Sequence, residues 1–291
     1  MVAMQNARKI LLTLFVTTML LGLIEGCAWI YVVSQPNIYQ GDLGYFWSLR
    51  PNIEEQIVKE EYSFQLKTNS DGLRDEELSS EAARWLFLGC STTLGWGVEA
   101  SEGFVDLLDN QLDSAQLING GQPGWTTQQG LMGIDQFKTL QPQHVFLGFG
   151  VRDAQFSYRE DREARPSPWI VSLNTMKLMA KMLPKKEQTG EKRRVSIEHF
   201  ERNLKLLRKS FPQAKVHLYV FPQLSREMEY EEVVRRLGGS VPTGFHGGDF
   251  FDKDTIHLNP AGHQKLARWF RERFLPSLGL ESKPPSTERK E

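Results

Sequence analysis

The stretch Arg84-Trp-Leu-Phe-Leu-Gly-Cys-Ser-Thr-Thr-Leu-Gly-Trp-Gly-Val98 carries the pattern from which the fold can be inferred. Four apolar residues run directly into Gly89, Cys90 and Ser91, and two more glycines follow. This pattern predicts a buried strand that breaks into a tight loop. Open α/β sheets place ligand chemistry just past the carboxyl ends of their strands, so Ser91 is a candidate functional residue.

Three further apolar segments have the same form, and the expected strands lie near residues 84–89, 115–119, 144–149 and 215–221, with a fifth possible near 240–245. Helical patterns separate them, beginning at Ser101 and covering residues 126–139, 197–211 and 260–274. Strands that alternate with helices predict a parallel sheet covered on both faces. We therefore expect a three-layer α/β/α sandwich of the flavodoxin-like type.

The chain of 291 residues is 40% hydrophobic, which is enough for one large or two small domains. Lys and Arg number 35 against 36 Asp and Glu, so the overall charge gives no reason to expect a nucleic-acid partner. The two cysteines are Cys27, in an apolar segment, and Cys90. A disulfide between them is not expected.

Residues 10–33 are almost uninterruptedly apolar, long enough to cross a hydrocarbon core about 30 Å thick. Arg8 and Lys9 precede this segment and the next basic residue is Arg50, so residues 1–9 are expected in the cytoplasm and the rest outside. We expect a single-pass anchor in the cell membrane. A cleaved signal peptide and lipoprotein processing at Cys27 are the alternatives.

Residues 34–80 are expected to form an ordered connector packed on the main domain, with a short strand near Tyr62–Leu66. Within it, residues 68–75 are dense in turn formers and favour a solvated turn. The main domain is expected to span residues 81–280, followed by a disordered tail at 281–291.

A longer excursion separates the third and fourth strands. It contains a possible helix near 171–183 and a charged run at 185–194, which is typical of a solvated loop.

Asp254 and His257 stand three residues apart, directly before the last helical pattern. Together with Ser91 they supply the parts of an acyl-transfer triad, because an imidazole can take the serine proton and a carboxylate can fix the imidazole tautomer. A metal site of Asp254, His257 and His263 is the alternative, but no further ligand stands at a telling spacing, so neither a metal nor another cofactor is expected.

The chain resembles the SGNH/GDSL hydrolases. Residues Gly89–Val98 are similar to their first block, commonly Gly-Asp-Ser-x-Thr-x-Gly-x-Gly, and the loop ending at Gly124 is similar to the second. Gly150-Val-Arg-Asp153 resembles the third block, Gly-x-Asn-Asp, and Asp254-Thr-Ile-His257 resembles the Asp-x-x-His block. The apolar N-terminus and residues 68–75 are similar to membrane-anchored members.

The resemblance implies that Ser91 is the nucleophile, His257 the base and Asp254 its orienting carboxylate. It also implies that the backbone N–H groups of Ser91 and Gly124 form an oxyanion hole.

Two residues depart from the family pattern. Cys90 replaces the usual aspartate, which is not the acid of the triad, and a catalytic thiol there is the less favoured interpretation. Arg152 replaces the asparagine that gives the third oxyanion donor. Its guanidinium could serve as that donor, bind an anionic substrate or pair with an acid.

The resulting hypothesis is a membrane-anchored serine esterase that hydrolyses O-acyl esters, with acetyl esters of a cell-surface glycan as the candidate substrate. An O-acyltransferase that uses the same triad is one alternative. A non-catalytic glycan- or protein-binding module on the same fold is the other.

Overall fold

The computed structural model of the chain describes residues 2–33, 37–42, 45–79, 83–112, 114–166, 175, 190–223 and 228–276. The chain divides into two compact units, Met1–Asn37 with Arg165–Glu187, and Ile38–Ala164 with Gln188–Glu291. The helix expected near 171–183, the first half of the charged run and the tail at 281–291 lie outside the described residues, except for Thr175.

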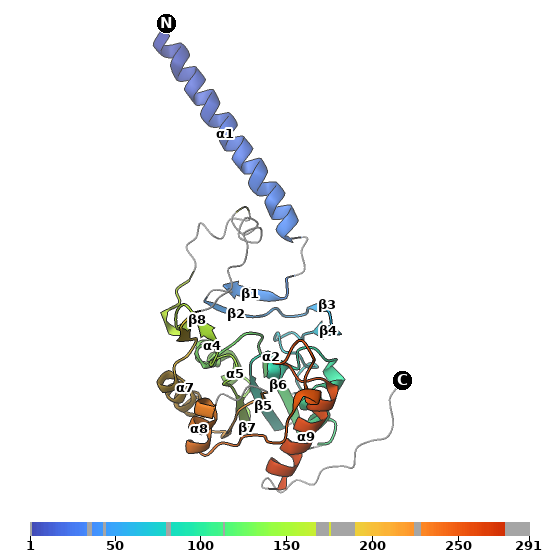
Figure 1. The fold of residues 1–291 in the computed structure, drawn as a ribbon. Helices are drawn as coiled ribbons and strands as arrows, with labels where there is room; N and C mark the ends of the chain where they lie inside the picture. The colour runs from blue at the N-terminus through green and yellow to red at the C-terminus, as the bar shows by residue number, and fades with distance from the viewer. Residues whose placement is uncertain are drawn as a thin grey trace. The chain divides into compact units, whose positions relative to one another are not determined.

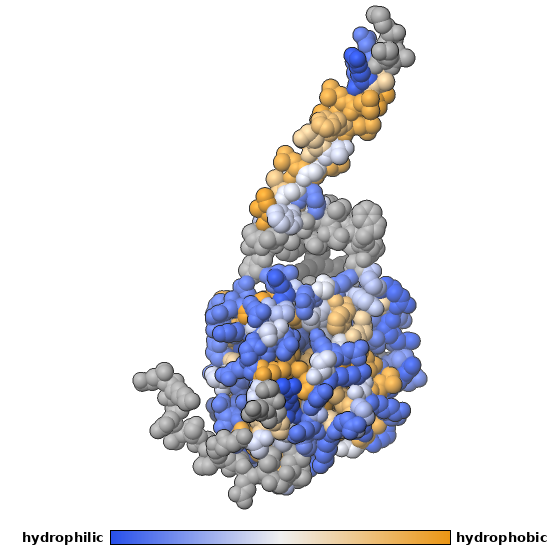
Figure 2. Space-filling view, turned by 180° about the vertical axis from the view of Figure 1, so that it is seen from behind, coloured by the Kyte–Doolittle hydropathy of each residue, from blue (hydrophilic) through white to orange (hydrophobic). Residues whose placement is uncertain are grey.

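The first unit contains the long helix α1 (Val2–Val33), whose apolar side chains are exposed along its length (Figure 2). Its segment Gln5–Tyr31 is long and apolar enough to cross a membrane, although a signal sequence would meet the same criteria. The carboxylate of Glu25 accepts hydrogen bonds from the N–H and the hydroxyl of Thr175, at 3.1 and 2.8 Å. The one acidic side chain in the apolar segment therefore has a polar partner within this unit.

The second unit is built on a parallel sheet with the strand order β10-β7-β5-β6 (Figure 1). Its strands are β5 (Ala83–Gly89), β6 (Ala115–Gly121), β7 (His144–Gly148) and β10 (Lys215–Tyr219). The first strand in the chain thus lies between the second and the third, which is the flavodoxin-like order. The predicted three-layer α/β/α fold is confirmed.

The fifth strand expected near 240–245 is wrong as an extended element. Only Ser240 pairs with the sheet, in a single parallel bridge to Tyr219. Pro242 follows two residues later and has no N–H to donate, so the ladder cannot continue through it.

Side chains of β5 alternate between the two faces of the sheet. Trp85 and Phe87 point to a core that includes α3 (Phe104–Asp109) and α9 (Pro260–Phe274). Leu86 and Leu88 point to a second core on the opposite face, formed with α4 (Thr127–Met132), α5 (Ile134–Lys138), α7 (Ile197–Lys209) and α8 (Met228–Arg236). Both faces are apolar because helices cover both.

Two helices begin or break differently from the sequence prediction. The segment expected as one helix over 126–139 is two, α4 and α5, which meet at Gly133 with φ −93° and ψ 4°. Ser101 does not cap a helix, because it lies inside the 3₁₀ turn η1 (Ala100–Glu102), which Glu99 caps.

The segment before the sheet forms two antiparallel hairpins, β1 (Tyr39–Asp42) with β2 (Phe46–Leu49) and β3 (Glu54–Val58) with β4 (Ser63–Lys67). The strand predicted near Tyr62–Leu66 is therefore confirmed as β4, displaced by one residue. The first hairpin contacts the loop after β6, where Trp47 Nε1–H donates to the carbonyl of Pro123 at 2.8 Å. The remaining short elements are β8 (Phe156–Ser157), η2 (Asp161–Glu163), β9 (Lys192–Arg193) and η4 (Gly247–Asp249).

Candidate active site

Ser91 is the first residue of the short helix α2 (Ser91–Leu94), which begins directly after β5. The close turn requires Gly89, because a Cβ there would lie 2.2 Å from Thr93 Oγ1 and 2.6 Å from the carbonyl oxygen of Gly148. The Ser91 side chain is only 2% exposed. The turn thus holds the hydroxyl in one place at the carboxyl end of a central strand.

His257 and Asp254 lie in the loop before α9. Asn259 fixes this loop, since its Oδ1 accepts the N–H of Gly262 while its Nδ2 donates to the carbonyls of Gly248 and Phe250, both at 2.9 Å. His257 Nε2 lies 2.8 Å from Ser91 Oγ, and His257 Nδ1 lies 2.8 Å from Asp254 Oδ2. The structure brings together all three residues that the sequence predicted.

The protonation states follow from these partners. A carboxylate can only accept, so Nδ1 of His257 carries the proton and the neutral imidazole accepts the Ser91 hydroxyl proton at Nε2. Burial lowers the pKa of His257, although Asp254 acts in the opposite direction. Burial alone would raise the pKa of Asp254, but hydrogen bonds from His257 and Tyr62 hold it well below its usual range. The arrangement can therefore take a proton from serine near neutral pH.

Two backbone N–H groups, those of Ser91 and Gly124, have no hydrogen-bond partner among the described residues. Gly124 has φ +79°, a conformation that favours glycine, and its carbonyl accepts Arg194 Nη1–H at 2.9 Å. Free N–H groups beside a serine hydroxyl are donors for a developing oxyanion.

Arg152, after β7, points its guanidinium at the same place. Its Nη2 lies 3.4 Å from Ser91 Oγ, a long contact, and its Nε is buried without a partner. In the described part of the chain no carboxylate pairs with this guanidinium. The substitution in the third block therefore leaves an unpaired positive charge beside the serine. The next residue, Asp153, is fully buried and accepts the N–H and hydroxyl of Thr127 at 2.9 and 2.5 Å.

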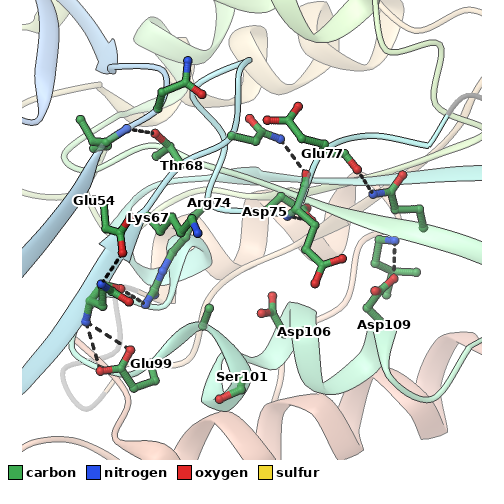
Figure 3. Close-up of a pocket in the computed structure, with 18 of the residues that line it drawn as sticks. Glu54, Lys67, Thr68, Arg74, Asp75, Glu77, Glu99, Ser101, Asp106 and Asp109 are labelled. Carbon is green, nitrogen blue, oxygen red and sulfur yellow. Dashed lines mark hydrogen bonds between the residues drawn. The ribbon is translucent and has the colours of Figure 1, made fainter.

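The solvated turn predicted for residues 68–75 is wrong at Arg74, which is only 2% exposed (Figure 3). Its guanidinium donates to the carbonyls of Leu94, Gly95 and Val98 at 3.1, 2.7 and 2.7 Å. These carbonyls follow Ser91, so Arg74 fixes the loop behind the nucleophile. The turn formers around Arg74 gave no signal of this burial, because the carbonyls that receive its N–H groups come from distant residues.

The alternative site residues have other roles. Cys90 is 1% exposed, and its Sγ lies 3.1 Å from Thr92 Oγ1 within the core. His263 is 1% exposed and its Nδ1 accepts the N–H of Phe104 at 3.2 Å, so it does not join His257 and Asp254. Among the described residues, no group of His, Cys, Asp or Glu side chains is arranged to hold a metal ion.

The model of the GDSL-like lipase/acylhydrolase family matches residues 87–265. Those residues include each of the site residues named above from Ser91 to His257. No curated protein matches the chain.

Solved structures with a similar fold include three with related titles. An alpha/beta hydrolase from the metagenome of Lake Arreo, Spain, is 20% identical, and the match covers 66% of this chain and 95% of that one, with a TM-score of 0.44. The lipase/acylhydrolase of Enterococcus faecalis is 18% identical over 71% of this chain and 100% of its own, with a TM-score of 0.44. A catalytic mutant of an acetylxylan esterase from Geobacillus stearothermophilus is 14% identical over 67% and 95%, with a TM-score of 0.42.

Proposed function

The chain belongs to the GDSL-like lipase/acylhydrolase family and is an ester hydrolase of that type, and from this premise we propose that Ser91, His257 and Asp254 are its catalytic triad. The observation that carries the proposal is the continuous hydrogen-bond chain from Ser91 Oγ through the two ring nitrogens of His257 to Asp254 Oδ2. Such a chain activates a hydroxyl that is otherwise a weak nucleophile.

In the proposed reaction, Ser91 Oγ attacks the carbonyl carbon of the ester while His257 Nε2 takes the hydroxyl proton. The carbonyl oxygen becomes an oxyanion that accepts hydrogen bonds from the N–H groups of Ser91 and Gly124 and from Arg152. The bond to the leaving alcohol then breaks and the alcohol takes the proton from His257. Water cleaves the acyl-enzyme by the same steps, which releases the acid and regenerates Ser91.

Arg152 is the third oxyanion donor in this proposal. A donor in this position typically contributes about 3 to 4 kcal/mol to the stability of the transition state. Arg152 has N–H groups to give, and its charge opposes the charge that develops on the oxygen. The 3.4 Å contact with Ser91 Oγ places these groups beside the reacting centre.

The substrate we propose is a short O-acyl ester, with acetyl groups on a cell-surface glycan as the candidate. Ser91 and His257 are only 2% and 5% exposed, so a small acyl group reaches the serine more readily than a long one. The helix α1 supports a location at the cell membrane, with the catalytic unit on the extracytoplasmic side, since Arg8 and Lys9 precede the apolar segment.

Labelling with a fluorophosphonate tests the triad in the full-length protein in detergent. We expect labelling of the parent chain, none of the Ser91→Ala variant and much slower labelling of His257→Ala. Ser101→Ala is the matched control, because Ser101 is exposed and outside the proposed site. Labelling or turnover of p-nitrophenyl acetate that survives in Ser91→Ala would end the proposal.

Two further measurements address substrate and location. A series of p-nitrophenyl esters should give the highest kcat/KM for acetate and a steady decline with chain length. Free acid as the product favours hydrolysis, whereas acyl-glycan with little free acid indicates transfer. The intact chain should remain with carbonate-washed membranes, while a shorter soluble chain would indicate a cleaved signal sequence.

A further inference from the structure

The turn between β3 and β4 contacts the loop that carries Asp254 and His257. We propose that Tyr62, in this turn, is a positioning residue of the triad that acts through Asp254. The proposal rests on the proposed function, because it assigns Tyr62 a role in the same reaction.

The contact is a direct hydrogen bond. The hydroxyl of Tyr62 donates to Asp254 Oδ2 at 2.8 Å, and the same oxygen accepts Nδ1–H of His257 at 2.8 Å. Burial and the Asp254 carboxylate raise the pKa of Tyr62 to about 12, so the phenol keeps its proton and remains a donor. The carboxylate is therefore held from two sides, by the base and by a residue 192 positions away in the chain.

The neighbouring residue fixes the backbone of the same loop. The two carboxylate oxygens of Glu61 accept the N–H of Lys253, both at 2.8 Å, and one of them also accepts the N–H of Asp254 at 3.0 Å. Lys253 Nζ also pairs with Glu60. One turn thus holds both the main chain and the side chain of the proposed triad acid.

Ring packing connects this turn to the nucleophile loop. The rings of Tyr62 and Phe251 lie 4.6 Å apart between centroids. On its other side Phe251 packs against Gly97, where a Cβ would lie 2.6 Å from the ring. Gly97 has φ +104° and belongs to the loop after Ser91, so Tyr62 is part of a packed layer between the two halves of the site.

A second donor on Asp254 has a predictable chemical effect. It fixes the rotamer of the carboxylate, and it withdraws negative charge from the oxygen that faces His257. A less negative carboxylate stabilises the imidazolium less, which keeps the pKa of His257 lower than it would be with Asp254 alone. Tyr62 therefore orients the base and also sets the pH at which it is neutral.

Other charged groups around this pair stay constant when Tyr62 is changed. They are Glu60 and Glu61 in the turn, Lys253 in the Asp254 loop, Arg152 after β7 and His263 on α9. A shift caused by removal of the Tyr62 hydroxyl can thus be assigned to the bond with Asp254.

The test is the pH profile of kcat/KM for p-nitrophenyl acetate, measured on the full-length Tyr62→Phe variant in detergent. We expect kcat to fall about tenfold, as for the loss of one hydrogen bond to a charged group, with KM little changed. The acidic limb should move to higher pH, because Asp254 without its second donor stabilises the imidazolium more. The matched control is Tyr45→Phe, in the turn of the other hairpin, whose hydroxyl has no hydrogen-bond partner among the described residues.

A monofluorinated tyrosine at position 62 gives an independent readout that keeps the ring. Its hydroxyl is a stronger donor, so the acidic limb should move in the opposite direction, to lower pH. Unchanged kcat and an unmoved limb in both variants would overturn the proposal, as would a loss of activity that only parallels a loss of thermal stability. Failure of the triad itself would appear separately, as turnover retained in Ser91→Ala.

Discussion

His257 Nε2 lies 2.8 Å from Ser91 Oγ, although 166 positions separate the two residues in the chain. Both side chains are buried, so the hydroxyl and the imidazole meet away from bulk water. A neutral imidazole in this position can act as a base only on the proton of that hydroxyl. The pair is therefore expected to work as one unit.

Removal of either member should have nearly the same effect as removal of both. We expect Ser91→Ala, His257→Ala and the double variant each to lower kcat by about 10⁴-fold or more, because a triad without one member loses the function of the others. Steady-state rates with p-nitrophenyl acetate provide the comparison. Losses that multiply in the double variant would show that the two residues act independently.

The activity should persist below the pH at which a free histidine becomes protonated. Burial and the charge of Arg152 lower the pKa of His257, against the opposing effect of Asp254. The base is active only when neutral, so the acidic limb of kcat/KM should have its midpoint below pH 6.5. A pH–rate profile over the acidic range measures this, and a midpoint above 6.5 would contradict the assigned balance.

Substitution of Arg152 separates its hydrogen bonds from its charge. Arg152→Met should lower kcat about 10²- to 10³-fold, as expected for the loss of one oxyanion donor. Arg152→Asn introduces the residue usual in the family and should retain more of the rate. Both variants lose the positive charge, so both acidic limbs should move to higher pH. Full activity of Arg152→Met would exclude this residue from the oxyanion hole.

Arg74 should matter for stability as well as for activity. Arg74→Met leaves the carbonyls of Leu94, Gly95 and Val98 without their donor, which we expect to cost about 3 kcal/mol or more. Thermal unfolding followed by tryptophan fluorescence measures the change. The exposed Arg268 supplies the control variant Arg268→Met, and equal unfolding temperatures in the two variants would refute the role of Arg74.

Asp106 should destabilise the protein at high pH. It lines a cavity of about 820 Å³ together with Asp75, and the labelled side chains in Figure 3 show the two carboxyls on facing walls. Burial, and then the charge of Asp75, raise the pKa of Asp106 to about 7 from an ordinary value of 3.8. The folded protein therefore binds this proton more tightly than the unfolded chain, and the contribution of Asp106 to stability falls as the pH rises from about 4 to about 7.

Asp106→Asn removes that charge, and the unfolding temperature should rise at pH 8 and change little at pH 4. Each kcal/mol relieved corresponds to about 2 to 4 °C for a protein of this size. Asp71→Asn, at an exposed turn, should change neither temperature. An equal effect of Asp106→Asn at both pH values would show that a cause other than ionisation is responsible.

Much of the fold could be predicted from the sequence because its signals are local. Trp85 to Leu88 are apolar at every position, as a strand covered on both faces must be, and the glycines after them mark the turn. Asn259 and Pro260 likewise mark the start of α9. The fifth strand was the exception, since Pro242 interrupts a segment that otherwise looks extended.

The candidate site was predictable only in part. Ser91, Asp254 and His257 could be named because each lies in a short motif at the end of an element. Tyr62 and Arg74 could not, because their neighbours in sequence are ordinary turn and hairpin residues. Their roles depend on which distant atoms their hydroxyl and guanidinium groups reach.

The sequence by itself determined the alternation of strands and helices, the apolar N-terminal segment and the three residue types of the triad, since each depends on periodicity or spacing within a few residues. Only the tertiary structure decided that the turn between β3 and β4 lies against Asp254, that Arg74 is buried behind the nucleophile, and that Arg152 faces Ser91 without a carboxylate partner in the described part of the chain. These are contacts between residues far apart in the chain. Their geometry is set by how the hairpins and loops pack on the sheet, which local sequence does not encode.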